Sequence, residues 1–130
     1  MRIGIIAPQG WTGEYDGWEP ERAWARTVEV ARQAERLGAE SVWLFDHLHT
    51  VPRPTDEITF ESFTTLAALA MATERVRIGV LVSCNTFRHP PLLAKEAVTV
   101  DQAPQLLERL ARADDDQVEV VFVAGLVEQR

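Results

Sequence analysis

Short apolar runs alternate with helix-like segments along this chain, and this alternation limits the possible folds more than any other feature. The apolar runs are residues 2–7, 41–45, 75–82 and 117–125. They are mostly continuous rather than alternating, which is typical of parallel strands covered by helices. The sequence therefore predicts an α/β fold with about four parallel strands and covering helices.

Apolar residues recur every three or four positions in the segments between these runs, which indicates helices. Pro20 suits the first turn of one helix, and Gly38 suits its C-terminal cap. Further helices are expected over 61–73, about 91–102 and about 104–112. The predicted order is thus β-α-β-α-β-α-α-β.

The predicted loops differ in length according to which element they follow. Loops after strands are long and rich in polar and aromatic residues, at 8–19, 46–60 and 83–91, whereas loops after helices are short, at 38–40 and 73–75. Ligands of parallel α/β folds bind at the carboxyl ends of the strands. We therefore expect the functional site among the long loops.

Composition narrows the function classes. A chain of 130 residues with a net charge of −7 reads as one acidic domain, which argues against nucleic acid or an anionic membrane as the main partner. The single cysteine, Cys84, cannot form an internal disulfide. No run approaches the roughly 18 apolar residues of a membrane span, and the first residues do not resemble a signal peptide. A cytoplasmic protein is expected.

The sequence Asp46-His47-Leu48-His49 directly follows the second apolar run. His47 could exchange a proton near neutral pH, with Asp46 orienting it or lining a polar ligand. Alternatively, His47 and His49 could bind zinc as in a metal-dependent hydrolase, but the third ligand would have to be His89. A third interpretation is that Asp46 only caps local backbone N–H groups.

Four small hydrogen-bonding residues, Ser83, Cys84, Asn85 and Thr86, follow the third run. They would allow a flat polar ligand to approach the backbone closely. The alternative is a plain turn from strand to helix, with Asn85 or Thr86 as the helix cap. Nothing in the sequence indicates a depressed pKa that would make Cys84 a nucleophile.

The loop at 9–19 is rich in glycine and aromatic residues. Its glycine spacing does not match the dinucleotide-binding or P-loop patterns. Trp11 and Trp18 could form a wall of a substrate pocket, or they could only pack the loop against the protein.

Several ordered blocks of the sequence are similar to a known family. MRIGIIAPQG, AERLGAESVWLFDHLH, FESFTTLAALAMATERVRIG and LVSCNTFRHPPLLAKEAVTVD resemble the N-terminal part of the bacterial luciferase-like flavin and deazaflavin oxidoreductases, within about residues 1–101. The branch that uses coenzyme F420 is the most similar. The resemblance implies part of a (β/α)₈ barrel of the TIM type. It also implies a cofactor, F420 or alternatively FMN as in the monooxygenases, at the mouth of the strands, and hydride transfer to a small organic substrate.

The resemblance also implies roles for individual residues. Asp46 matches an aspartate that lies by the cofactor, and His47 matches a histidine beside the ring on its substrate side. The irregular segment that supports the ring corresponds to Ser83, Cys84, Asn85 and Thr86. His49 and Arg88 also fall on family-like positions, but the resemblance assigns them no role.

The sequence departs from the family after Asp101. The family continues through a Ser-Gly-Gly-Arg turn into a glycine-rich strand, whereas residues 102–130 here suggest a helix and a strand. A full barrel takes about 250 residues. We therefore expect residues 1–130 to form a single truncated barrel domain with open sheet edges, completed by a homo-oligomer or by another chain. A non-catalytic fragment or partner subunit of a split barrel is the alternative to an active enzyme.

Overall fold

Three parallel strands form the centre of the protein. The structure is a computed structural model that describes residues 2–111, with side chains up to residue 103. Strands β1 (Gly4–Ile6), β2 (Ser41–Leu44) and β3 (Arg77–Val80) lie side by side in that order, and both pairs are parallel. The predicted parallel α/β arrangement is confirmed.

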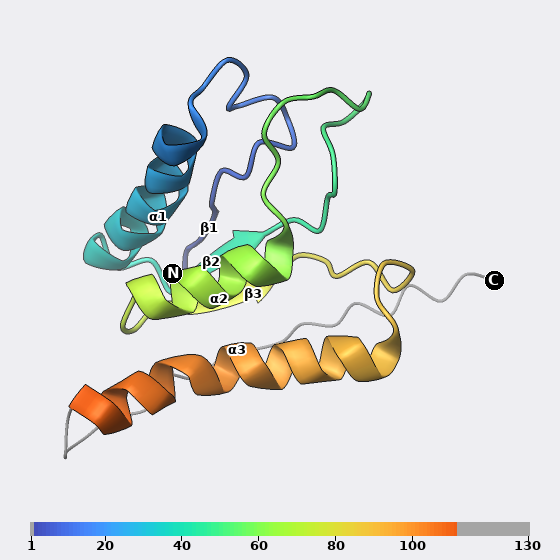
Figure 1. Ribbon diagram of the computed structural model, residues 1–130. Coiled ribbons are helices and arrows are strands. Elements are labelled where there is room, and N and C mark those ends of the chain that lie inside the picture. The colour runs from blue at the N-terminus through green and yellow to red at the C-terminus, as the bar shows by residue number, and fades with distance from the viewer. Residues whose placement is uncertain (1, 112–130) are drawn as a thin grey trace.

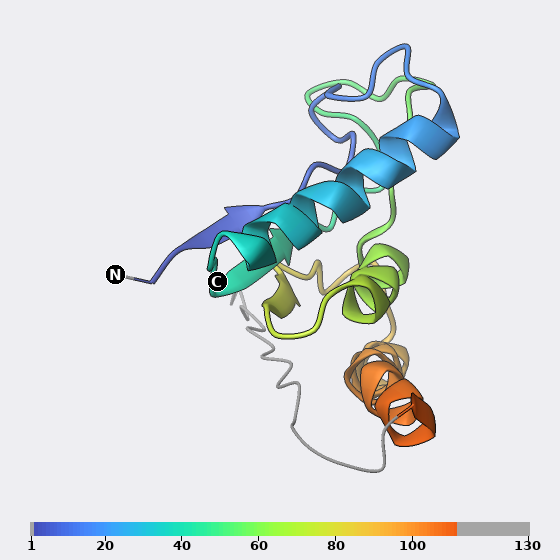
Figure 2. The same cartoon turned by 90° about the vertical axis from the view of Figure 1, so that its left-hand side faces the viewer.

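The helices connect and cover these strands (Figures 1 and 2). Helix α1 (Pro20–Arg36) links β1 to β2, and helix α2 (Ser62–Ala72) links β2 to β3. Helix α3 (Pro90–Ala111) follows β3 and packs along α2. Each strand is therefore followed by a helix, as in one side of a (β/α)₈ barrel. None of the described helices is both long enough and apolar enough to cross a membrane.

The hydrophobic core lies between one face of the sheet and the helices. Alternate residues of β2, Val42 and Leu44, are fully buried, and Val42 pairs in register with Ile5 and Ile78. Leu66 of α2 is also fully buried in this cluster. Burial of one such aliphatic side chain contributes about 1.5–3 kcal/mol, so this face anchors the fold.

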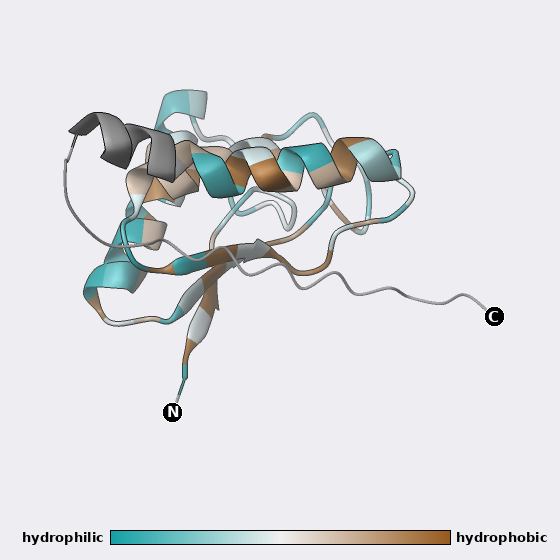
Figure 3. Ribbon diagram, turned by 90° about the horizontal axis from the view of Figure 1, so that it is seen from below, coloured by the Kyte–Doolittle hydropathy of each residue, from teal (hydrophilic) through white to brown (hydrophobic). Residues whose placement is uncertain are grey.

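The other face of the sheet carries residues of mixed polarity. Trp43 donates a hydrogen bond from Nε1 to Oγ of Ser41 at 2.8 Å, and the side chain of Ile6 is 50% exposed. Within residues 2–111, the described helices pack against the opposite face only (Figure 3). In a closed barrel this second face would point into the interior.

One prediction about the helices was wrong. Residues 91–102 and 104–112 were expected to form two helices, but α3 is continuous from Pro90 to Ala111. Pro104 lacks a backbone N–H and therefore leaves the carbonyl of Val100 without its usual partner. The buried side chain of Val100 shows that α3 is anchored immediately before this point, so tertiary packing outweighs the local signal. The strand predicted over 117–125 lies outside the described residues.

A carboxylate joins α1 to the start of β3. The side chain of Glu35 accepts hydrogen bonds from the backbone N–H groups of Glu74, Arg75 and Val76 at 2.9, 2.5 and 2.9 Å. Burial raises the pKa of Glu35, but these hydrogen bonds outweigh it and hold the pKa below its ordinary value.

Replacement of Glu35 should therefore weaken the fold in a pH-dependent way. A group with a lowered native pKa stabilises the fold above its unfolded pKa of 4.5, and that stabilisation is lost as the pH falls through the native value. We expect Glu35→Gln to lower the free energy of unfolding by about 1 kcal/mol at pH 7. Urea unfolding at several pH values measures this difference, which should shrink below pH 4.5. Glu29→Gln, which removes a half-exposed carboxylate that pairs with Arg36 on the same helix, is the matched control. An equal loss in both variants would contradict the prediction.

Candidate active site

The loops after β1 and β2 pack against each other at the carboxyl end of the sheet. The buried side chain of Gln9 accepts a hydrogen bond from the N–H of Phe45 at 2.6 Å and donates to the carbonyls of Phe45 and Phe60 at 3.0 and 3.3 Å. Gly10 has a φ of 95°, and a Cβ there would lie 1.8 Å from the carbonyl oxygen of Ile58. Only glycine allows this close approach of the two loops.

Asp46, the second residue after β2, lies beneath the surface of this edge. Its side chain is 1% exposed, and both carboxylate oxygens are fully used as acceptors. Oδ1 accepts from Oγ of Ser62 at 2.6 Å, and Oδ2 accepts from the backbone N–H of Cys84 at 2.8 Å. Arg88 binds both oxygens, at 2.6 and 2.9 Å. The aspartate thus joins the ends of β2 and β3 to the start of α2.

Arg88 is the cation at the centre of this cluster. Its side chain is 7% exposed and contacts three carboxylates, those of Asp46, Glu61 and Glu96. The Nε atom lies 3.2 Å from Oε2 of Glu96, which is close enough for an ion pair although the two groups are not aligned for a hydrogen bond. The guanidinium carbon also lies 4.5 Å from the ring centroid of Phe63.

These contacts favour the ionised forms of Asp46 and Glu61. Burial raises the pKa of Asp46, but the hydrogen bonds and the charge of Arg88, together with the bonds from Ser62 and Cys84, lower it below its ordinary value. The pKa of Glu61 is lowered in the same way, chiefly by the N–H groups of Thr64 and Phe63. Glu61 therefore both caps α2 and binds Arg88.

His47 lies at the surface, directly after this buried aspartate. Its ring is half-buried and stacks on Trp11, with centroids 4.6 Å apart and an interplanar angle of 19°. Phe45 packs against Trp11 from another side, with centroids 4.7 Å apart. Within the described residues neither ring nitrogen of His47 makes a hydrogen bond, so both can exchange a proton with a ligand.

The segment after β3 is irregular and partly exposed. The Leu81–Val82 peptide bond is cis, and a turn follows it. Asn85 and Thr86 are exposed, and the thiol of Cys84 lies 3.1 Å from the hydroxyl of Thr86. That hydrogen bond lowers the pKa of Cys84.

The remaining candidates are placed differently. Trp18 packs on Tyr15 and under the guanidinium of Arg22, in the part of the loop that leads into α1. Nδ1 of His49 lies 2.8 Å from the carbonyl of Thr50, and the side chain is exposed. His89 is exposed just before α3. No group of three or more metal-binding side chains occurs within the part of the chain that the structure describes.

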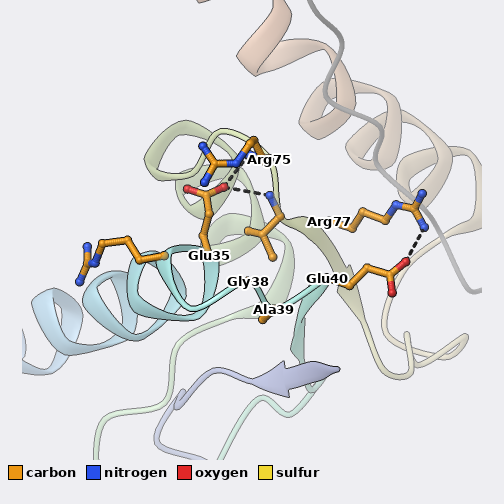
Figure 4. Close-up of a pocket in the computed structure, with 8 residues that line it drawn as sticks. Glu35, Gly38, Ala39, Glu40, Arg75 and Arg77 are labelled. Carbon is orange, nitrogen blue, oxygen red and sulfur yellow. Dashed lines mark hydrogen bonds and ion pairs between the residues drawn. The ribbon is translucent and has the colours of Figure 1, made fainter. Parts of the chain in front are cut away.

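A shallow pocket of about 350 Å³ lies at the opposite end of the sheet (Figure 4). The end of α1, the residues that precede β2 and the start of β3 line it, including Glu35, Glu40 and Arg77. Its two carboxylates already have partners within the protein, since Glu40 pairs with Arg77 at 3.3 Å and Glu35 accepts hydrogen bonds from backbone N–H groups. This pocket is separate from the predicted site, because it adjoins the amino ends of the strands.

Sequence reasoning missed the residues that support the site. Arg88, Glu61 and Gln9 stand 42, 15 and 37 positions from Asp46 in the chain, and only the fold brings them together. Glu61 could have been found as an acidic residue at the start of a predicted helix. No local pattern indicates the partners of Gln9 or Arg88.

Comparisons with known proteins agree with this architecture. The sequence pattern of a family described as luciferase-like monooxygenase matches residues 1–105. An F420-dependent glucose-6-phosphate dehydrogenase from Intrasporangium calvum is 32% identical over 88 residues. That match covers 68% of this chain but only 25% of the relative, so the chain spans about a quarter of that protein's length.

Solved structures with similar folds include enzymes that use different cofactors. A monooxygenase from Streptomyces bottropensis matches with a TM-score of 0.63 and 24% identity, over 94% of this chain and 32% of its own. The oxygenating constituent of a diketocamphane monooxygenase from Pseudomonas putida, solved with FMN, matches with a TM-score of 0.60 and 18% identity, over 81% and 27%. An F420-dependent secondary alcohol dehydrogenase, solved with an F420–acetone adduct, matches with a TM-score of 0.57 and 24% identity, over 93% and 31%.

The stacking of His47 on Trp11 should make tryptophan fluorescence depend on pH. A protonated imidazole in contact with an indole quenches its emission more strongly than a neutral one does. We expect the emission to fall when acid protonates the imidazole that stacks on Trp11, and we expect His47→Gln to lose this change. His49→Gln and His89→Gln are matched controls that should keep it. An unaltered pH dependence in His47→Gln would show that the stack does not form in solution.

Proposed function

Because this chain belongs to the luciferase-like monooxygenase family, we propose that it is an oxidoreductase that binds coenzyme F420 and serves hydride transfer to or from a small organic molecule. One observation carries the proposal. Asp46 at the end of β2 binds the turn of residues 83–86 at the end of β3, directly beside the accessible ring of His47. Strand ends that meet in this way are where parallel α/β enzymes bind their ligands.

The residues at this edge fit a flat ring with apolar faces and a polar rim. Leu81 and Val82 are 39% and 43% exposed and offer apolar contact. Asn85 and Thr86 follow them and offer exposed hydrogen-bonding groups. We assign the cofactor to this segment, with Ser83 and Cys84 between the apolar and the polar positions.

The residues of the chain would position the cofactor, exchange a proton with the substrate and line the substrate pocket. Bound F420 supplies the carbon that gives or accepts the hydride, and the protein supplies positioning. His47 exchanges a proton with the substrate, since the stack on Trp11 fixes its ring and neither ring nitrogen has a hydrogen-bond partner among the described residues. Asp46 supports the turn beneath the ring, because its own oxygens are occupied by protein donors. Trp11 and Trp18 remain proposed walls of the substrate pocket.

F420 is preferred to FMN because the relative at 32% identity is named as F420-dependent. The described residues provide three strands, and a closed pocket needs more of the barrel. We propose that a second copy or another chain provides the remaining part of the barrel. The substrate and the activity of the whole assembly are therefore proposals as well.

Fluorescence titration tests cofactor binding. The full chain is titrated with F420 and, separately, with FMN, and we expect F420 to bind more tightly. Asn85→Ala should weaken binding several-fold, since a hydrogen bond contributes about 0.5–1.5 kcal/mol. Gln33→Ala, which removes an exposed amide from α1, is the matched control and should bind as the wild type does. Tighter binding of FMN would reassign the cofactor, and no binding of either at high micromolar protein would favour a non-catalytic fragment.

A further inference from the structure

We propose that Arg88 is the positioning residue of this site: it fixes the carboxylate of Asp46 and, through that carboxylate, the turn of residues 83–86. Its effect on cofactor binding rests on the function proposed above, whereas its effect on the turn does not. The sequence offered Arg88 only as a family-like position without a role.

The geometry of the guanidinium is the first argument. All three of its nitrogens face carboxylates that come from different elements. The two terminal nitrogens bind Asp46 in a forked arrangement, and one of them also binds Glu61, while Nε faces Glu96. Asp46 follows β2, Glu61 precedes α2 and Glu96 lies in α3. A planar fork satisfies this arrangement, which a single ammonium group cannot do.

The charges make the arrangement depend on Arg88. Without it, three carboxylates would face one another in a region where Asp46 is almost fully shielded from water. Mutual repulsion would turn the side chain of Asp46 or favour its protonation. Either change removes the geometry that Asp46 has in the structure.

The link from Asp46 to the turn is one short hydrogen bond. Oδ2 accepts from the backbone N–H of Cys84 at 2.8 Å, and the same oxygen binds Arg88 at 2.6 Å. The hydroxyl of Ser83 is more distant, at 3.5 Å. The backbone of the proposed cofactor segment is therefore held by an oxygen atom whose position Arg88 determines.

Cys84 reports on this turn without any cofactor, because it is the only cysteine of the chain. The experiment measures the alkylation rate of Cys84 by iodoacetamide across a range of pH, so that changes in thiol pKa and in access are separated. The variants are Arg88→Gln, Asp46→Asn and the double variant. Arg36→Gln, which removes an arginine that pairs with Glu29 on the surface of α1, is the matched control.

We expect Arg88→Gln and Asp46→Asn each to change the alkylation rate of the thiolate at least threefold. The double variant should lie closer to the wild type than the product of the two effects predicts, because either substitution alone already removes the contact between Arg88 and Asp46. Arg36→Gln should have no effect. Effects of the two substitutions that simply multiply would overturn the proposal, since Arg88 would then act through Glu61 and Glu96 alone.

Further measurements distinguish loss of folding and loss of cofactor binding from the role of Arg88. Circular dichroism and urea unfolding identify a variant that fails to fold. If Arg88→Gln fails, Asp46→Asn decides by itself, and an unchanged alkylation rate in that folded variant would overturn the proposal. F420 titration of the same variants should show binding weakened about tenfold or more, as for groups that support metal ligands. Wild-type protein that binds no cofactor would defeat the proposed function, whereas the alkylation result would still decide the role of Arg88.

Discussion

A guanidinium whose side chain is 7% exposed has little water around it, so the protein must supply its acceptors. Arg88 obtains them from three different parts of the chain, through Asp46 after β2, Glu61 before α2 and Glu96 in α3. A buried ion pair of this kind contributes little net stability compared with an apolar substitute, but loss of one partner is costly. The cluster therefore specifies how the strand ends and helix starts fit together, while the apolar core beneath supplies most of the stability.

The carboxyl edge of the sheet divides into a buried supporting layer and an accessible layer. Asp46 belongs to the first, because protein donors occupy its oxygens. His47 belongs to the second, with its ring held by Trp11. Two adjacent residues thus belong to different layers, Asp46 buried and His47 half-buried. Membership in the luciferase-like monooxygenase family is consistent with a ligand at this edge.

The elements were largely predictable because their signals are local. Continuous apolar runs located the three described strands, and Pro20 and Gly38 marked the limits of α1 closely. The break expected near Pro104 was wrong, because a local signal for a helix end competes with packing along the whole of α3. The sequence predicted Trp11 and Trp18 equally as walls of a substrate pocket. Of these two residues, Trp11 stacks on His47, whereas Trp18 packs on Tyr15.

Local patterns were enough to predict the three described strands, helices α1 and α2, the long loops at one end of the sheet, and the presence of Asp46 and His47 there. Periodicity and chain order contain that information, because both follow from neighbouring residues. The partners of these residues became evident only from the folded arrangement. Arg88 reaches Asp46 across 42 positions, and Gln9 reaches Phe45 across 36. Such contacts depend on how separate strand ends meet in space, and no local pattern specifies that.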